Sequence, residues 1–417
     1  RGLGDVYKRQ DGIRVGSNSE LVIEESEIRL PHLRGIRVGG NGSIAVRDSD
    51  LHTYGIFMDE TAQSSNDAKT LKKLEITNST VLTGDIIGAR GGYSSVEEIV
   101  IHDSSIRLND EYTYNYCTIG GGTNGSFGSI DIQNSQIHIP SSGGNTAIGN
   151  GWQVYYNRES RIRIANSEVS VRCASLGPAI GAAWDSGSGR INIIIENSTV
   201  TAKGGNLRTD GNYVPGIGKN ALGRAPEIGI QILNSTVDTF RLTEKGGTDY
   251  VYDDLHEKNL PGIPPENITI CGSTVNGTRI DHSPDEYGKC ALCGKYDIGY
   301  CYEHGLLTME GLTDCVSDGS EKKMTGLSHK TGENETKQLT ENTDYTAIYS
   351  NNVHPYTLKP DDAGFDPAKA PKVTLYGTGN YCGKAEHYFT ISENAAAAPS
   401  ITTSSLPDGK VGEAYSQ

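Results

Sequence analysis

A motif of alternating apolar and polar positions recurs nine times in the first two thirds of the chain. Its form is apolar-x-apolar-x-[Asn/Asp]-Ser-x-apolar, and the residues five and three before the Ser and two after it are always Ile, Leu or Val. Alternation with a period of two among β-branched residues predicts a strand with one buried face. The copies span residues 21–28, 44–51, 74–81, 99–106, 130–137, 162–169, 193–200, 230–237 and 268–275.

The polar positions of the motif predict a corner. The residue before the Ser is Asn, Asp or Glu in eight copies and Gly272 in the ninth. Asn and Asp tolerate the left-handed conformation, and Gly adopts it freely. A Gly-rich apolar patch follows in most copies, as in 118–122 (TIGGG) and 179–183 (AIGAA). The aligned serines are Ser26, Ser49, Ser79, Ser104, Ser135, Ser167, Ser198, Ser235 and Ser273.

A unit of strand, corner, second strand and variable loop cannot bury its apolar face alone. Stacking such units creates a continuous core, and 23 to 38 residues per unit fits a parallel β-helix. The fold class predicted is therefore all-β, with a right-handed parallel β-helix (a solenoid) over residues 11–277, followed by small β-sandwich modules. The buried ladder should consist of Ile76, Ile101, Ile132, Ile164, Ile195 and Ile232.

Composition agrees with this prediction and excludes some functions. The 417 residues include 52 Gly but only 5 Phe, 3 Met and 2 Trp, which argues for many turns and against a helical protein. The formal net charge of −15 disfavours a nucleic-acid partner or an anionic membrane surface. No apolar run is long enough to predict a transmembrane segment. Eight Cys in a chain of this size do not indicate a disulfide scaffold.

Both ends of the chain differ from the rest. Residues 1–10 (RGLGDVYKRQ) match nothing downstream, and we expect them to be non-native read-through. Residues 393–417 begin with a linker that contains an Ala run up to Pro399, and the stretch 399–417 resembles the start of an immunoglobulin-like, cadherin-like surface domain, which we expect to be truncated.

A Cys/His connector is predicted over residues 278–319. Cys290, Cys293, Cys301 and His304 have the spacing C-x2-C-x7-C-x2-H, which suits a tetrahedral structural Zn²⁺ site. His282 is a competing ligand. A disulfide or free thiols are the alternative, since an exported protein meets oxidising surroundings. The connector resembles the small His/Cys knuckles between modules of gut-bacterial surface proteins.

Residues 320–392 read as a small β-sandwich module. The stretches LTENTDYTAIYSNNV (339–353) and KVTLYGTGNYCGKAEHYFTI (372–391) resemble a family of bacterial surface repeats. The departures are an insertion around 355–371 and Cys382 where Thr is usual. The modular order resembles cell-surface proteins of gut Firmicutes that carry a pectin-lyase-like β-helix. The resemblance implies spacing and display, and an extracellular or cell-surface location.

Aromatic residues suggest a carbohydrate site. Trp152 and Trp184, the only tryptophans, each lie 17 residues after a repeat Ser, and Asp185 adjoins the second. Equivalent positions on adjacent coils are about 4.8 Å apart, so the two rings could bind a sugar face or stack on each other.

Candidate catalytic acids are fewer. Asp85 and Asp110 each lie six residues after a repeat Ser and could face each other on neighbouring coils, or be solvated loop acids. No Arg or Lys recurs beside them in register to serve a lyase. The leading hypothesis is a non-enzymatic adhesin or glycan-binding protein whose partner is a polysaccharide, a host glycan or the cell wall. The alternative is a polysaccharide lyase or glycoside hydrolase of the same fold, since the fold alone does not choose.

Overall fold

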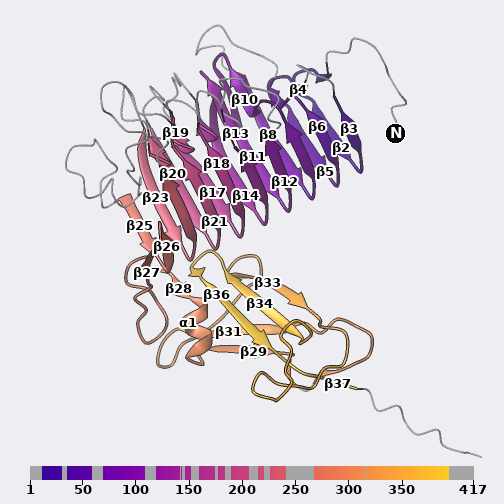
Figure 1. Cartoon of the computed structure of the whole chain (residues 1–417), viewed down its shortest axis with the longest axis vertical. Helices are drawn as coiled ribbons and strands as arrows, with labels where there is room; N and C mark the ends of the chain where they lie inside the picture. Colours follow the sequence, from indigo (N-terminus) through magenta and orange to yellow (C-terminus); the bar gives the residue numbers. More distant parts are fainter. Residues whose placement is uncertain are drawn as a thin grey trace, which may run out of the picture.

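The computed structural model is almost entirely β, and its larger part is a stack of three parallel sheets (Figure 1). Up to β24 each coil of the described stack contributes one strand to each sheet, so strands three apart in sequence are neighbours in space, and β25 and β26 then extend the second and third sheets. This is the predicted parallel β-helix. The structure describes residues 12–30, 35–58, 69–108, 119–140, 142, 146–151, 159–173, 177–183, 189–205, 215–219, 226–240, 267–313 and 315–393.

The first sheet carries the Gly-rich patches of the sequence. In it Gly149 has a φ of 136°, and a Cβ there would lie 2.0 Å from the carbonyl oxygen of Gly181. From β10 to β22 this position is always glycine, which lets these strands stack so closely, whereas β1, β4 and β7 have Arg14, Arg37 and Phe57 there. The strands are β1 (Ile13–Val15), β4 (Ile36–Val38), β7 (Ile56–Met58), β10 (Ile87–Gly91), β13 (Ile119–Thr123), β16 (Ile148–Asn150), β19 (Ile180–Ala182) and β22 (Ile217–Lys219).

The second sheet contains the first half of each repeat motif, and the predicted ladder is confirmed in it. All six ladder isoleucines have no exposed surface, and each is the register partner of the next, as Ile132 is of Ile164. The strands are β2 (Glu20–Glu24), β5 (Ser43–Arg47), β8 (Lys69–Thr77), β11 (Ser94–His102), β14 (Ser126–Gln133), β17 (Glu159–Ala165), β20 (Arg190–Glu196), β23 (Glu227–Leu233) and β25 (Ile268–Cys271).

The third sheet begins just after the corner of each motif. Its last strand, β27, turns back antiparallel to β26 and ends the stack. The strands are β3 (Glu27–Arg29), β6 (Asp50–Thr53), β9 (Thr80–Thr83), β12 (Ser105–Leu108), β15 (Gln136–Ile139), β18 (Glu168–Arg172), β21 (Thr199–Lys203), β24 (Thr236–Phe240), β26 (Ser273–Val275) and β27 (Thr278–Ile280).

The corner between the second and third sheets explains the polar part of the motif. The eight corner residues from Glu25 to Asn234 have φ between 47° and 52°, and Gly272 has a φ of 60°. Each repeat Ser donates its hydroxyl to the carbonyl two residues earlier and accepts the N–H of the preceding repeat Ser at 3.1 Å, as Ser167 accepts from Ser135. The repeated Asn-Ser pair is therefore a structural device that satisfies backbone groups at a sharp bend.

The C-terminal module, residues 296–392, has one core of its own. Ile298 and Leu312, from the predicted connector, pack in the same cluster as Val373 and Ile391. The boundary expected at 319/320 therefore runs through a single core. The elements are β28 (Tyr296–Asp297), α1 (Ile298–Glu303), β29 (Leu307–Glu310), β30 (Cys315–Val316), β31 (Gly326–Lys330), β32 (Thr336–Gln338), β33 (Tyr345–Ser350), β34 (Lys372–Gly377), β35 (Tyr381–Cys382), β36 (Lys384–Tyr388) and β37 (Ile391–Ser392).

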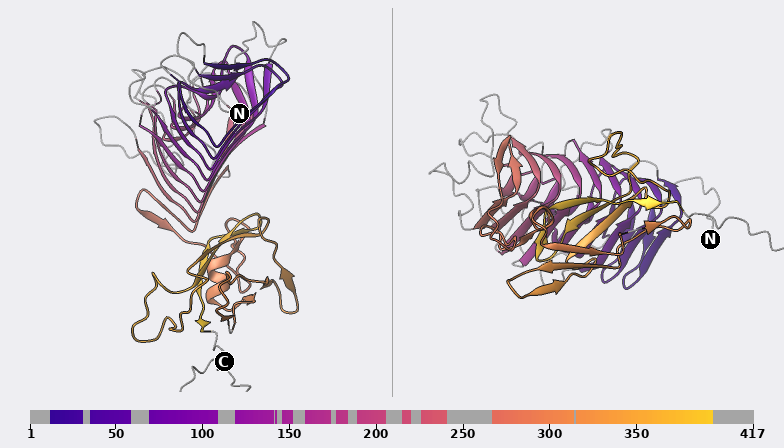
Figure 2. Two further views of the ribbon diagram at one scale, coloured as in Figure 1. Left: turned by 90° about the vertical axis from the view of Figure 1, so that its right-hand side faces the viewer. Right: turned by 90° about the horizontal axis from the view of Figure 1, so that it is seen from below.

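The C-terminal module lies beside the narrow edge of the solenoid, where the second and third sheets meet (Figure 2). Residues 281–295, which we call the knuckle, join the two parts. Lys295 of the knuckle reaches back to the buried Glu196 at 3.4 Å, and Glu196 is also paired with Arg163 at 2.6 Å. The knuckle and the C-terminal module therefore both lie along this edge of the solenoid.

Candidate metal centre and binding face

Four side chains meet where the last coil of the solenoid touches the knuckle. They are Cys271, His282, Cys290 and Cys293, and their donor atoms all lie within 4.8 Å of one another. Cys271 ends strand β25, and the other three come from the knuckle. Three thiols and one imidazole at this spacing could hold a metal ion.

The donor atoms are already in contact. The Cys271 sulfur lies 3.1 Å from the Cys290 sulfur and 2.7 Å from Nδ1 of His282, while Cys293 Sγ lies 3.9 Å from the same nitrogen. Cys271 and Cys290 are buried and pack against Leu233 of the preceding coil. The cluster is therefore anchored to the apolar end of the solenoid rather than to a surface loop.

The corner at Gly272 differs from the other corners at two positions, and both differences make room for this cluster or contribute to it. A Cβ on Gly272 would lie 2.2 Å from Nε2 of His282, so the Asn of the other corners would collide with the imidazole. The residue before it, Cys271, places a thiol where earlier copies have residues such as Thr77 or Glu196. These two departures admit His282 and supply one sulfur donor.

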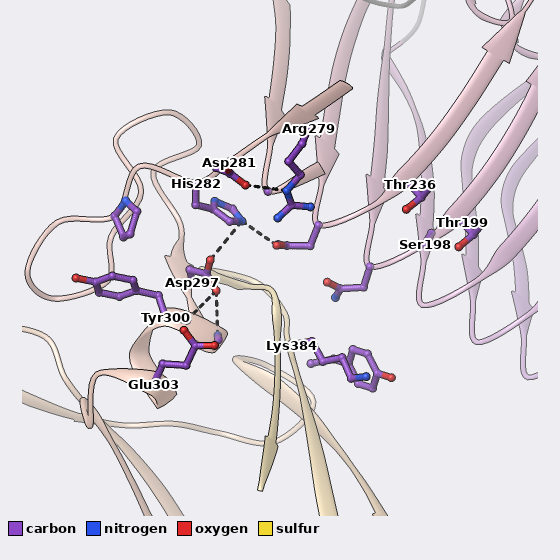
Figure 3. A pocket seen from close by; sticks show the side chains of 16 residues that line it. Ser198, Thr199, Thr236, Arg279, Asp281, His282, Asp297, Tyr300, Glu303 and Lys384 are labelled. Carbon is purple, nitrogen blue, oxygen red and sulfur yellow. Dashed lines mark hydrogen bonds and ion pairs between the residues drawn. The ribbon is translucent and has the colours of Figure 1, made fainter. Parts of the chain in front are cut away.

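A second layer of contacts orients the imidazole (Figure 3). Nε2 of His282 lies 2.8 Å from Oδ1 of Asn234 and 3.6 Å from the Asp297 carboxylate. A hydrogen bond from Nε2–H leaves Nδ1 directed at the cysteines, the arrangement usual for ligating histidines. Asp297 also caps α1 by accepting the backbone N–H of Gly299 at 2.9 Å. The corner Asn234 and the helix cap therefore hold the ring in place.

Within the cluster the thiolate form, which binds metals, is favoured at Cys293 and disfavoured at Cys271, whose pKa is raised by its hydrogen bond to Cys293 and by burial. Hydrogen bonds from the thiols of Cys271 and Cys382, and another from His282, hold the pKa of Cys293 far below its ordinary value despite burial. Burial lowers the pKa of His282, but its bonds to Cys293 and Cys290 and the charge of Asp297 outweigh this and raise the pKa to about 9.

The ligand set differs in part from the one predicted. Cys290 and Cys293 are in the cluster, and His282, the competing ligand, takes the place of His304. Cys301 lies 3.3 Å from Nε2 of His329 inside the C-terminal module, and the exposed His304 contacts the Tyr300 carbonyl at 2.9 Å. The physical reason is helix α1, which directs the Cys301 thiol toward Tyr287 and His329 rather than toward Cys290 and Cys293, and which ends at the capping residue His304.

Cys271 was not predicted as a ligand because it lies inside a repeat motif. The break in the corner pattern at Gly272 is the sequence signal that could have identified it.

Asp85 is the one predicted catalytic acid among the described residues. It is only 5% exposed, and its carboxylate lies 3.5 Å from Nε of Arg90 on the same coil. Burial raises its pKa to about 6, although Arg90 and a hydrogen bond from Tyr54 act in the opposite direction. Arg90 is a basic neighbour that the register argument did not find. Asp110, Trp152, Trp184 and Asp185 lie outside the described residues.

The outer face of the third sheet carries two rows of mostly polar side chains. In register along one row are Thr80, Ser105, Gln136, Glu168, Thr199 and Thr236; the second row includes Arg107, His138, Ser170, Thr201 and Asp238. Neighbouring members of a row are about 4.8 Å apart. At the C-terminal end, a polar cleft of 740 Å³ continues this face toward Tyr300 and Lys384 (Figure 3).

Comparison of the chain with protein-family models, with curated proteins and with solved structures found no match. Within the part of the chain that the structure describes, no helix has the length and apolar character needed to cross a membrane.

Proposed function

We propose that this chain is a non-catalytic extracellular or cell-surface protein whose solenoid binds a polysaccharide or host glycan, and that a structural zinc ion fixes the knuckle to the last coil. The observation that carries the binding role is the pair of polar rows on the third sheet. Hydroxyl, amide, imidazole and charged groups recur there with a constant spacing from coil to coil. Such rows suit an extended polysaccharide, whose hydroxyl groups also recur along its length.

The placement of Asp85 supports binding without cleavage. A carboxylate that acts on a glycosidic bond must reach the bond, with a second carboxylate roughly 5–10 Å away. Asp85 is buried and is paired with Arg90. It is therefore better suited to holding its own coil than to reaching a substrate.

The donor set of the metal centre supports zinc. Structural zinc sites have four protein ligands, which are Cys sulfurs and His nitrogens, whereas a catalytic site has three protein ligands and keeps the fourth position open for water. Here four protein donors are available, and two of the cysteines are buried. The expected role of zinc is therefore to stabilise the junction.

The binding proposal can be tested with purified full-length chain on arrays of pectins, glycosaminoglycans, mucin glycans and cell-wall polysaccharides. A double variant, Gln136→Ala with Thr199→Ala, should weaken binding about tenfold or more, because each lost hydrogen bond costs roughly 1 kcal/mol. The matched control is Lys73→Ala with Arg161→Ala on the outer face of the second sheet. Equal affinity of the double variant and the wild type would contradict the proposed face.

Polysaccharide cleavage is the second candidate, and one observation favours it. A carboxyl group with a pKa of about 6 beside an Arg is the kind of group that general acid catalysis uses. Release of reducing ends or unsaturated products by the wild-type chain, abolished in Asp85→Asn, would replace the binding proposal with this one. Binding that is lost only in Trp152→Ala and Trp184→Ala would instead move the site to the two tryptophans.

A further inference from the structure

The C-terminal module places a further buried thiol against the metal centre. Cys382 ends strand β35 and is 1% exposed. Strand β35 pairs with β28, so that Cys382 is the register partner of Asp297, two residues after the knuckle. Its sulfur lies 3.9 Å from Nε2 of His282 and is hydrogen-bonded to Cys293. Cys293 therefore has one thiol neighbour from the solenoid and another from the module.

Cys382 is a fifth donor beside the four that lie within 4.8 Å of one another, and a tetrahedral ion takes only four. In a zinc site with metal–sulfur bonds of about 2.3 Å, two sulfurs are separated by about 3.7 Å, and a sulfur and a nitrogen by about 3.5 Å. Nδ1 of His282 is only 2.7 Å from the Cys271 sulfur, which is a hydrogen-bond distance. For both to ligate one ion, these two atoms would have to move apart by almost 1 Å, which is more than the roughly 0.6 Å that the sulfurs of Cys271 and Cys290, at 3.1 Å, would need.

The surroundings restrain the imidazole from making that movement. Nε2 of His282 is held at 2.8 Å by Asn234 Oδ1, and the ring lies over Gly272, where a Cβ would be 2.2 Å from Nε2. Cys382 is held less closely, because besides the bond to Cys293 its sulfur makes long contacts, of 3.6 Å to the Tyr296 carbonyl and 3.9 Å to Nε2 of His282.

We propose that Cys382 is the fourth sulfur ligand of the metal centre, so that the ion is bound by Cys271, Cys290, Cys293 and Cys382 while His282 stays as a hydrogen-bond donor beside it. The four thiols release their protons to the solvent as the sulfur–metal bonds form. The ion then joins three parts of the chain, namely the last coil, the knuckle and the C-terminal module. This inference rests on the zinc site of the proposed function.

A cation and a hydrogen-bond donor lie beside the proposed thiolates. Four thiolates and one Zn²⁺ carry a net charge of −2, and a cation close by offsets part of it. Lys295 acts on Cys382 as a nearby positive charge, although the negative charge of Asp297 acts on the same thiol more strongly in the opposite direction. His282 can donate a hydrogen bond to the cluster from within contact distance.

The test is X-ray absorption at the zinc edge on the full-length chain, purified under reducing conditions and loaded with one equivalent of Zn²⁺. The wild type should show four sulfurs at about 2.3 Å and no imidazole. His282→Ala should keep four sulfurs, and Cys382→Ser should lose one and bind zinc 10- to 100-fold more weakly. Cys301→Ser, which changes another buried thiol of the module, is the matched control and should leave both readouts unchanged.

Three sulfurs and one imidazole in the wild type, with the imidazole lost in His282→Ala, would overturn the inference and leave the zinc proposal standing. This outcome is read from the wild type and His282→Ala, so the test still decides if Cys382→Ser fails to fold. Failure of the wild type to bind zinc, or a disulfide between Cys271 and Cys290 in the chain as purified, would instead remove the zinc proposal itself.

Discussion

The solenoid and the C-terminal region are stabilised in different ways. In the solenoid each contact is repeated from coil to coil, isoleucine on isoleucine and serine on serine. In residues 278–392 the polar contacts do not repeat along the chain. Examples are the ion pair between Lys295 and Glu196 and the contact between Cys301 and His329. A repeated contact spreads the stability over many coils, whereas a single contact concentrates it in a few groups.

Removal of the metal should show this difference most strongly. Zinc contributes on the order of 10 kcal/mol to the folding of small zinc-binding peptides, so chelation should open the knuckle while leaving the solenoid folded. Hydrogen exchange on the full-length chain is the measurement. We expect amides of residues 282–310 to exchange at least 100-fold faster and amides of β14, β17 and β20 to be unchanged. Loss of protection in both regions would show that the two depend on the same ion.

A cavity in the ladder should have the opposite pattern. Ile164→Ala removes a fully buried side chain between two other isoleucines and should cost about 2–5 kcal/mol in the free energy of unfolding of the solenoid. Denaturant unfolding measures the cost, and zinc content should not change. Ile348→Ala, at a position 54% exposed, is the control and should have an effect within about 0.5 kcal/mol. A drop in zinc content would show that the ladder and the metal centre are coupled.

The pH dependence of the solenoid should reveal the cost of burying Asp85. Its pKa rises from 3.8 to about 6 on folding, so the folded state binds the proton more tightly between these values. The stability contribution of Asp85 is therefore complete below pH 4, falls as the pH rises to 6, and is level above it. The fall should amount to about 3 kcal/mol at most. The measurement is the free energy of unfolding of the wild type and of Asp85→Asn, from denaturant unfolding at several pH values between 4 and 7. The wild type should lose stability relative to the variant by this amount as the pH rises, and an equal pH dependence of the two would contradict the prediction.

The corners allow the sharpest comparison, with the smallest expected effects. Gly272→Asn restores the residue of the other corners but should collide with His282, and zinc should bind about 10- to 100-fold more weakly. Asn166→Gly makes the reverse change at an ordinary corner and should alter stability by less than about 1 kcal/mol, because Gly adopts the left-handed conformation without strain. Titration with zinc and denaturant unfolding measure the two. Normal zinc affinity in Gly272→Asn would mean that His282 does not lie against this corner.

The contrast also explains which features the sequence could predict. The ladder isoleucines, the left-handed corners and the Gly-rich sheet follow from a pattern that repeats, because a slip of one residue would expose every apolar side chain of a strand. Cys290 and Cys293 were found from local spacing. Cys271 and Cys382 come from places 22 and 89 residues away from Cys293, and nothing in local spacing joins them. The salt bridge of Asp85 with Arg90 depends on a bend within one coil that no register argument describes.

The direction of the inter-coil hydrogen bonds has a mechanical consequence. These bonds run along the solenoid axis, so a pull along the axis loads the bonds of one terminal coil before those of the next. A coil of 30 residues, the interval between Ser49 and Ser79, adds about 100 Å to the chain when it peels away, against about 4.8 Å of axial length while folded. A metal ion that ties the last coil to the knuckle would block peeling from that end. Under tension unravelling would then start away from the knuckle, and each coil that peels away would release its length in one step.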